Sequence, residues 1–260
     1  MEVIRSRDNK TIKEIKKLHE KKYRNLNKKF IVEGQRFVKE ALESDFEIEY
    51  VIIDENMQDK LNDLDIENER LLIVSETVFK DVCDTKMPQG ILAIVKNKQV
   101  VAEVCAGFYV LLDKVQDPGN MGTIIRTANA AGANGVILTK GTVDVYNEKT
   151  LRSTMGSIFK IPVIIDENLE FVSELKSSGF KLICSSLDTD KNFYGVNLSG
   201  KVIIAVGNEG NGISDEIYNI SDEKVKIPMP GSAESLNVGI AAGIMMFEVV
   251  RQKNSWKFVL

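Results

Sequence analysis

The sequence has very little histidine and cysteine, the side chains that most often bind transition metals. His19 is its one histidine, and Cys83, Cys105 and Cys184 are odd in number and far apart. Zinc sites and disulfide frameworks need sets of such residues at short, regular spacings, and a Ser-His-Asp triad needs a histidine. We therefore expect no metal site and no disulfide, reduced and mostly buried thiols, and a solvated His19.

Long apolar runs and the common nucleotide-binding motifs are also missing. No run reaches the roughly 18 apolar residues of a membrane span, and the first residues lack the apolar core of a signal peptide. No P-loop sequence occurs, and the glycines at 207, 210 and 212 do not have the GxGxxG spacing of dinucleotide-binding proteins. We therefore expect a cytoplasmic protein with no membrane partner, no P-loop and no NAD site.

Acidic residues slightly outnumber basic ones, but positive charge is concentrated at the start of the chain. The formal net charge is -4, yet residues 1–40 hold 13 Lys or Arg against 6 Asp or Glu. Such asymmetry is typical of proteins that bind a polyanion, although a solvated helix face explains lysine runs equally well. We expect residues 21–29 to form an exposed basic loop. If the polyanion is a nucleic acid, we expect five residues of this loop to contact its phosphates: Lys21, Lys22, Arg24, Lys28 and Lys29.

Residues 1–97 predict a compact α/β domain. Ile12, Ile15 and Leu18 share one face of a helix that Asn9 or Thr11 would cap. Further elements follow from short apolar runs and from 3.6-residue periodicity. We expect strands at 30–32, 51–53, 71–74 and 91–95, a helix over 35–42, and helical or irregular stretches at 56–64 and 77–83.

Residues 98–106 leave the apolar pattern and are expected to form a linker to a second α/β domain over 107–260. Its predicted strands are 108–112, 136–138, 163–165, 182–185 and 202–206. Its predicted helices are 122–131, 147–154, 169–177, 215–218 and 237–252. Regular alternation of strands and helices predicts a mostly parallel sheet covered on both faces.

Three loops in this second domain follow strands and contain glycine or proline. They are Asp117-Pro118-Gly119-Asn120-Met121-Gly122, Gly207-Asn208-Glu209-Gly210-Asn211-Gly212, and the segment from Lys226 to Asn237 that contains Ile227-Pro228-Met229-Pro230-Gly231. Ligand sites of α/β folds lie in loops at the carboxyl ends of strands. The sequence therefore predicts one site built from all three loops.

The three loops resemble the motifs of the SpoU (TrmH-like) RNA ribose 2'-O-methyltransferases of the SPOUT superfamily. The matches are Asn120-x-Gly122-x3-Arg126, Gly207-x-Glu209-Gly210-x-Gly212, and Ile227-Pro228-Met229 followed by Ser235-Leu236-Asn237-Val238. They occur in the family's order and spacing and cover Phe108 to about Arg251. The resemblance implies a deep carboxy-terminal trefoil knot and, for residues 1–97, an RNA-binding domain with an L7Ae/L30e-like fold.

The resemblance also implies S-adenosylmethionine as the cofactor and a homodimer that completes the site. It assigns cofactor binding to Gly207, Ile227 and Leu236, although plain core packing is the alternative for Ile227 and Leu236. It assigns catalysis to Asn120, Arg126, Glu209, Ser235 and Asn237.

The expected roles of these five residues follow from their chemistry. Asn120 would hold a phosphate or the ribose, or cap the helix after it. Arg126 is the family's proposed base, but a guanidinium releases its proton reluctantly, so we expect it to clamp phosphate or stabilise the developing alkoxide. Glu209 would orient Arg126 or a neighbouring asparagine, or be a solvated acid. Ser235 and Asn237 would cap the last helix and face the reaction centre.

The target of the reaction is left open by the sequence. An additional amino-terminal domain favours 23S ribosomal RNA as the substrate, because such a domain is commoner in the rRNA-directed members. Transfer RNA is the second possibility. A non-catalytic RNA-binding module is the third, and the presence of all five catalytic residues argues against it.

Overall fold

The computed structural model describes residues 2–58, 64, 66, 70–98, 104 and 106–254. The chain forms two compact units, Met1–Gln99 with Asp144–Phe159, and Val100–Val143 with Lys160–Leu260. The order of elements along the chain did not predict that residues 144–159 belong with the first unit. Most of the predicted linker, 98–106, lies outside the described residues, as does Cys105.

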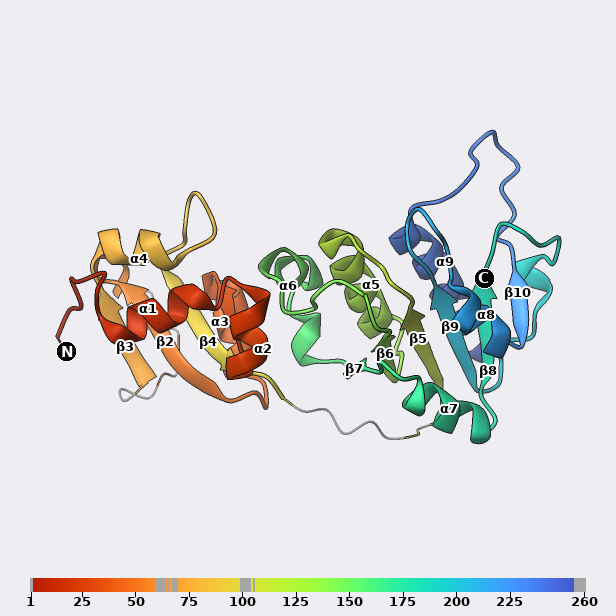
Figure 1. Ribbon diagram of the computed structural model, residues 1–260, viewed down its shortest axis with the longest axis horizontal. Coiled ribbons are helices and arrows are strands. Elements are labelled where there is room, and N and C mark those ends of the chain that lie inside the picture. The colour runs from red at the N-terminus through yellow and green to blue at the C-terminus, as the bar shows by residue number, and fades with distance from the viewer. Residues whose placement is uncertain are drawn as a thin grey trace, which may run out of the picture. The chain divides into compact units, whose positions relative to one another are not determined.

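The first unit is a four-stranded mixed sheet with helices (Figure 1). Its elements are α1 (Lys10–Lys17), α2 (Lys21–Asn27), β1 (Lys29–Glu33), α3 (Gln35–Leu42), β2 (Ile48–Asp54), β3 (Leu71–Val74), α4 (Glu76–Val82), β4 (Ile91–Lys96), α6 (Glu148–Thr154) and the 3-10 turn η3 (Ser157–Phe159). The strand order is β1-β4-β2-β3, with β2 and β3 parallel and the other two pairs antiparallel. The predicted α/β class is confirmed for this unit.

Helices α1 and α4 pack on one face of this sheet through a cluster that includes Ile12, Ile15, Phe79 and Leu92. Asn9 caps α1, because its side chain accepts hydrogen bonds from the N–H groups of Thr11 and Ile12. Ile12, Ile15 and Leu18 are all buried, which confirms the apolar face predicted for α1.

The predicted basic loop at 21–29 is wrong, because Lys21–Asn27 form helix α2. Arg24 is 3% exposed, and its guanidinium donates to the backbone oxygens of Leu18 and His19 and, through Nε and Nη2, to Asp144 Oδ2 at 2.9 and 2.6 Å. Asp144, 120 positions further along the chain, thus holds helix α2 in place.

Two of the five basic residues expected to contact RNA are therefore committed elsewhere. Arg24 is buried in its pair with Asp144, and Lys29 Nζ lies 2.6 Å from Glu49 Oε2. Lys21, Lys22 and Lys28 form no ion pair within the described part of the chain. The RNA contact of these three stays a prediction.

The segment 144–159 is held to the first unit by aromatic stacking and by His19. The rings of Phe30 and Tyr146 stack with centroids 4.6 Å apart. His19 is half-buried rather than solvated as expected, with Nδ1 2.5 Å from Glu148 Oε1 and Nε2 3.0 Å from the oxygen of Val82. The hydrogen bond with Glu148 raises the pKa of His19 against the opposing effect of burial.

The second unit is a six-stranded sheet in which every pair is parallel, which confirms the predicted sheet. Its strands are β5 (Phe108–Leu112), β6 (Gly135–Leu138), β7 (Val163–Ile165), β8 (Lys181–Ser185), β9 (Val202–Val206) and β10 (Glu223–Val225), in the order β10-β8-β9-β5-β6-β7. Its other elements are α5 (Pro118–Ala130), α7 (Glu170–Ser177), the 3-10 turn η4 (Phe193–Gly195), α8 (Asp215–Ile220) and α9 (Val238–Asn254).

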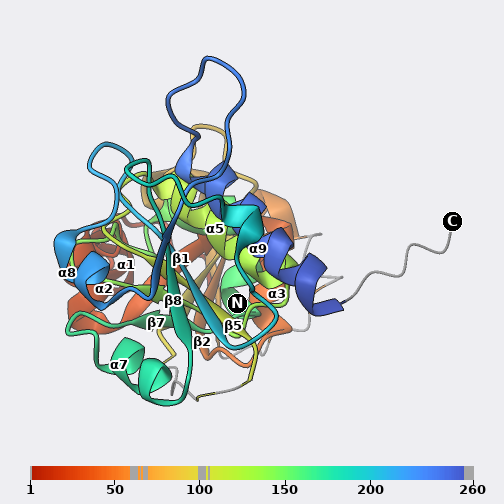
Figure 2. The same ribbon diagram turned by 90° about the vertical axis from the view of Figure 1, so that its right-hand side faces the viewer.

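The helices cover both faces of the second sheet. Residues of α7 and α8 share a buried cluster with Tyr109, Leu111 and Ile203 of the strands. Helices α5 and α9 pack on each other on the opposite face (Figure 2). Because all six strands are parallel, their carboxyl ends meet at one edge, where the three motif loops emerge. No helix among the described residues has the length and apolarity of a membrane span.

Candidate cofactor and catalytic site

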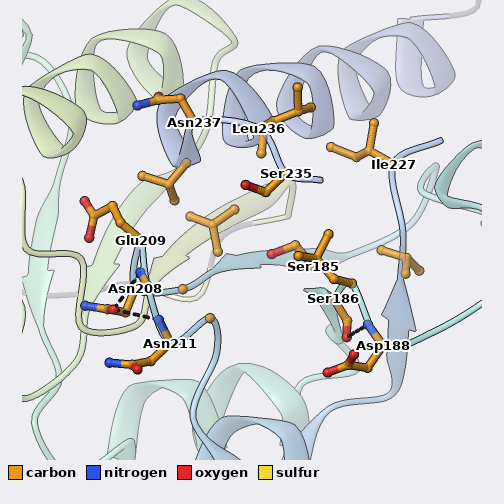
Figure 3. A pocket seen from close by; sticks show the side chains of 18 of the residues that line it. Ser185, Ser186, Asp188, Asn208, Glu209, Asn211, Ile227, Ser235, Leu236 and Asn237 are labelled. Carbon is orange, nitrogen blue, oxygen red and sulfur yellow. Dashed lines mark hydrogen bonds between the residues drawn. The ribbon is translucent and has the colours of Figure 1, made fainter. Parts of the chain in front are cut away.

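A cavity of about 590 Å³ lies at the carboxyl edge of the second sheet. Its walls come from the segments that follow β8, β9 and β10, and from residues 235–238 and 241 at the start of α9. Figure 3 shows the side chains after β8 facing those of residues 207–212, the glycine loop, across the cavity, with Ser235 and Leu236 between them. The volume falls within the roughly 300–1,000 Å³ of small-molecule pockets.

All three residues predicted to bind the cofactor line this cavity: Gly207, Ile227 and Leu236. Ile227 is partly exposed and Leu236 is 36% exposed, so neither is plain core packing. Their side chains offer apolar surface beside the backbone groups of the loops.

Gly207 is required by the loop itself. A Cβ at this position would lie 2.2 Å from the carbonyl carbon of Gly212 and 2.4 Å from the nitrogen of Ile213. Both are backbone atoms, so no side chain could move aside. The glycine loop therefore folds back on its own first residue at a distance that only glycine permits.

Three of the predicted catalytic residues form one hydrogen-bonded chain. Asn237 Nδ2 donates to Asn120 Oδ1 at 2.9 Å, and Asn120 Nδ2 donates to Glu209 Oε1 at 2.9 Å. The N–H groups of Gln116 and Asp117 also donate to the Glu209 carboxylate, at 3.0 and 3.1 Å. Of the two partners considered for Glu209, Arg126 and a neighbouring asparagine, the structure shows the asparagine.

The Glu209 carboxyl is kept ionised by these donors. Burial raises its pKa, but the hydrogen bonds from Asn120 and from the two backbone N–H groups outweigh this, and the pKa is lowered from its ordinary value. An acceptor-only carboxylate at one end of the chain fixes the direction of both amides. The oxygen of Asn120 consequently points to Asn237.

Of the expected capping roles, the structure shows that of Asn237 but not those of Asn120 and Ser235. Asp117 caps α5 by accepting from the N–H of Asn120 at 2.8 Å, so Asn120 lies inside the first turn and is not the cap. Asn237 does cap α9, because its Oδ1 accepts from the N–H groups of Gly239 and Ile240 at 2.9 and 3.3 Å. Ser235 lines the cavity without a hydrogen bond to any other described residue.

Arg126 takes no part in the hydrogen-bonded chain or in the wall of the cavity. Its side chain is exposed on α5, does not line the cavity, and forms no hydrogen bond or ion pair with residues that the structure describes. The structure therefore brings together Asn120, Glu209, Ser235 and Asn237 but not Arg126.

The sequence did not single out two other contributors. Asn208 shapes the glycine loop, since its Oδ1 accepts from the N–H groups of Gly210 and Asn211 and its Nδ2 donates to the oxygen of Lys114. The segment 185–188 lines the side of the cavity next to β8. Two signals in the sequence could have identified them. Asparagine before glycines is typical of tight turns, which applies to Asn208, and residues that follow a parallel strand often line ligand sites, which applies to 185–188.

Two protein-family models and a curated protein match this chain. Residues 107–247 match the SpoU rRNA Methylase family, and residues 9–93 match the MRM3-like substrate binding domain. The 23S rRNA (guanosine(2553)-2'-O)-methyltransferase RlmP of Bacillus subtilis is 37% identical over 96% of this chain and 99% of its own length.

Solved structures show the same architecture. An AdoMet-bound rRNA methyltransferase from Sinorhizobium meliloti has a TM-score of 0.85 and 33% identity, covering 96% of this chain and 97% of that one. The SpoU methyltransferase AviRb from Streptomyces viridochromogenes, in complex with AdoMet, has a TM-score of 0.85 and 26% identity, covering 95% and 99%. The family match spans more than half of the chain and includes every motif loop, so the protein belongs to the SpoU rRNA methylase family, as its sequence predicted.

Proposed function

We propose that this protein transfers a methyl group from S-adenosylmethionine to a ribose 2'-hydroxyl of 23S ribosomal RNA. The observation that carries the proposal is the cavity of about 590 Å³ whose wall includes Glu209 and Asn237, two members of the hydrogen-bonded chain. The Bacillus subtilis relative, whose name gives a 23S rRNA nucleotide as its target, supports the substrate. The two AdoMet-bound relatives support the cofactor.

The cavity suits the proposed cofactor chemically. Ile227, Met229 and Leu236 supply apolar surface for a flat base, while Ser186 and Asp188 supply polar groups beside it. Gly207 keeps the loop backbone close to the cavity. S-adenosylmethionine, when bound, supplies a methyl group that is already activated, so the protein has to position the hydroxyl and manage its charge.

We assign positioning to the chain of Asn120, Glu209 and Asn237. The carboxylate fixes the Asn120 amide, and Asn120 fixes Asn237, so the two amides are preorganised before RNA binds. The hydroxyl of Ser235, which has no partner among the described residues, is free to bond the ribose or a phosphate. These roles agree with the chemistry of each side chain.

We propose that Arg126 clamps a phosphate of the RNA or stabilises the developing charge on the 2'-hydroxyl oxygen. Its exposure and its lack of a partner within the described chain leave the guanidinium free to bind RNA. Because it does not line the cavity of its own chain, we propose that it acts at the cavity of a second copy.

Replacing Arg126 with alanine should lower the rate of methyl transfer by on the order of 100-fold, the effect of removing one charge-stabilising donor. Cofactor affinity, measured by calorimetry, should stay unchanged, because the work is done on the hydroxyl as the transition state forms. Arg126→Lys keeps the charge but loses the planar fork that holds a phosphate. Near-wild-type turnover of the Arg126→Lys variant would contradict the clamp.

The RNA substrate is tested by offering the protein both rRNA and tRNA with labelled S-adenosylmethionine. Labelled methyl groups in tRNA alone would contradict the rRNA substrate.

A two-fold dimer through α9 is the proposed assembly. The last helix carries small residues that would let a second chain approach closely, but two of them pack inside the chain, since Gly239 and Gly243 lie against Thr123 and Thr127 of α5. Ile240 and Phe247 remain 55% and 51% exposed and supply the apolar contact instead. Sedimentation should give about twice the chain mass of 29.1 kDa. A monomer at micromolar concentration would contradict both the interface and the shared site.

The finer features of the fold rest on the family resemblance. We propose that the carboxy-terminal unit contains the trefoil knot and that the amino-terminal domain has the L7Ae/L30e-like fold. A ribosomal RNA substrate also supports the cytoplasmic location. An experimental electron-density trace from β8 through α9 tests the knot, because an unthreaded path would exclude it.

A further inference from the structure

Asp113 is a buried carboxylate to which the proposed reaction assigns no role. It follows β5 directly and is 1% exposed. No Lys or Arg among the described residues pairs with it. Burying an unpaired charge is costly unless hydrogen bonds compensate, so the hydrogen-bond partners of Asp113 indicate what it holds in place.

Its hydrogen bonds reach both ends of the glycine loop. The backbone N–H of Asp113 donates to the oxygen of Val206, the last residue of β9, at 2.9 Å. Its Oδ2 accepts from the N–H of Ser214, which follows the loop, at 2.6 Å. Asp113, the residue directly after β5, is thus hydrogen-bonded to the residues on both sides of the loop of residues 207–213.

Thr139 fixes the orientation of the carboxylate. Its Oγ1 accepts from the N–H of Lys114 at 3.2 Å and donates its proton to Asp113 Oδ1 at 2.9 Å. Oδ2 is therefore left to the Ser214 N–H, in a bond short enough to be charge-assisted. The Ser214 hydroxyl is buried without a partner, so the main chain of Ser214, and not its side chain, is what Asp113 holds.

From this arrangement we propose that Asp113 is a positioning residue that clamps the glycine loop closed and thereby sets the places of Gly207 and Glu209. It acts through the loop and touches neither cofactor nor RNA. The loop's own contacts, between Gly207 and Gly212 and between Asn208 and Gly212, depend on its two ends being held at this separation. The link to S-adenosylmethionine rests on the proposed function, but the clamp does not.

The chain offers a matched control. Asp166 also directly follows a strand, β7, is 6% exposed, and accepts from a backbone N–H, that of Val172 at 2.9 Å. Its partner lies in α7, whose residues do not line the cavity. Asp113→Asn and Asp166→Asn should therefore remove equivalent charges and lower thermal stability similarly.

The two variants should differ in amide hydrogen exchange and in cofactor affinity. In the free protein, Asp113→Asn should speed exchange across residues 207–213 by at least about tenfold, while Asp166→Asn should leave that loop unchanged. Affinity for S-adenosylmethionine should fall by at least about tenfold in Asp113→Asn only. Ser214→Ala, which keeps the bonded N–H, should behave as wild type.

Unchanged exchange of the loop in Asp113→Asn would overturn the clamp. Equal effects of Asp113→Asn and Asp166→Asn on the loop would overturn it too, since general destabilisation would then suffice. A wild-type protein that fails to bind S-adenosylmethionine would refute the proposed function instead, and the exchange measurement would still decide the inference.

Discussion

An rRNA substrate with a single 2'-deoxy nucleotide at the target position should bind this protein but accept no methyl group. The proposed nucleophile is the ribose 2'-hydroxyl, and its removal leaves the phosphates and the base in place. RNA affinity, which depends mainly on phosphate contacts, should change little. Transfer of labelled methyl from S-adenosylmethionine and a binding titration on the same RNA give the two measurements.

The control is the same RNA with the deoxy substitution at the neighbouring nucleotide, which should be methylated at close to the normal rate. Loss of transfer in both RNAs would indicate that the duplex or loop structure was disturbed. Transfer to the RNA that lacks the target hydroxyl would show methylation of the base and refute the ribose assignment.

Gly207→Ala should lower affinity for S-adenosylmethionine by more than about 100-fold, roughly 2.7 kcal/mol. The added Cβ would lie 2.2 Å from the carbonyl carbon and 2.3 Å from the carbonyl oxygen of Gly212. Since these are backbone atoms, the loop has to move, and Glu209 moves with it. Calorimetry measures the affinity, and circular dichroism shows whether the variant remains folded.

Gly210→Ala is the matched control in the same loop. A Cβ at 210 would meet only the Asn208 Oδ1 atom, at 3.7 Å, which is an ordinary contact. This variant should bind the cofactor as wild type does. Wild-type affinity of Gly207→Ala, or equal losses in both variants, would contradict the close packing of the loop as the reason for glycine at 207.

The elements of both units followed from local patterns in the sequence. The apolar runs from Phe108 to Leu112 and from Val202 to Val206 are buried strands, as their composition required. Helix α3 begins and ends at the predicted residues. Helix α2 did not follow from local sequence, because what holds it is the bond between Arg24 and the distant Asp144.

The sequence also indicated which loops form the site, because the motifs follow predicted strands and can be identified from residue type and spacing alone. Only the tertiary structure decided how those residues meet. Asn120 is hydrogen-bonded to Glu209, 89 positions away, and to Asn237, 117 positions away. The side chain of Arg126, only six residues after Asn120, takes part in neither bond. Asp113, which directly follows β5, joins the ends of the glycine loop that follows β9. Hydrogen bonds depend on distance and direction in space, and the parallel strands that bring these ends together are far apart along the chain.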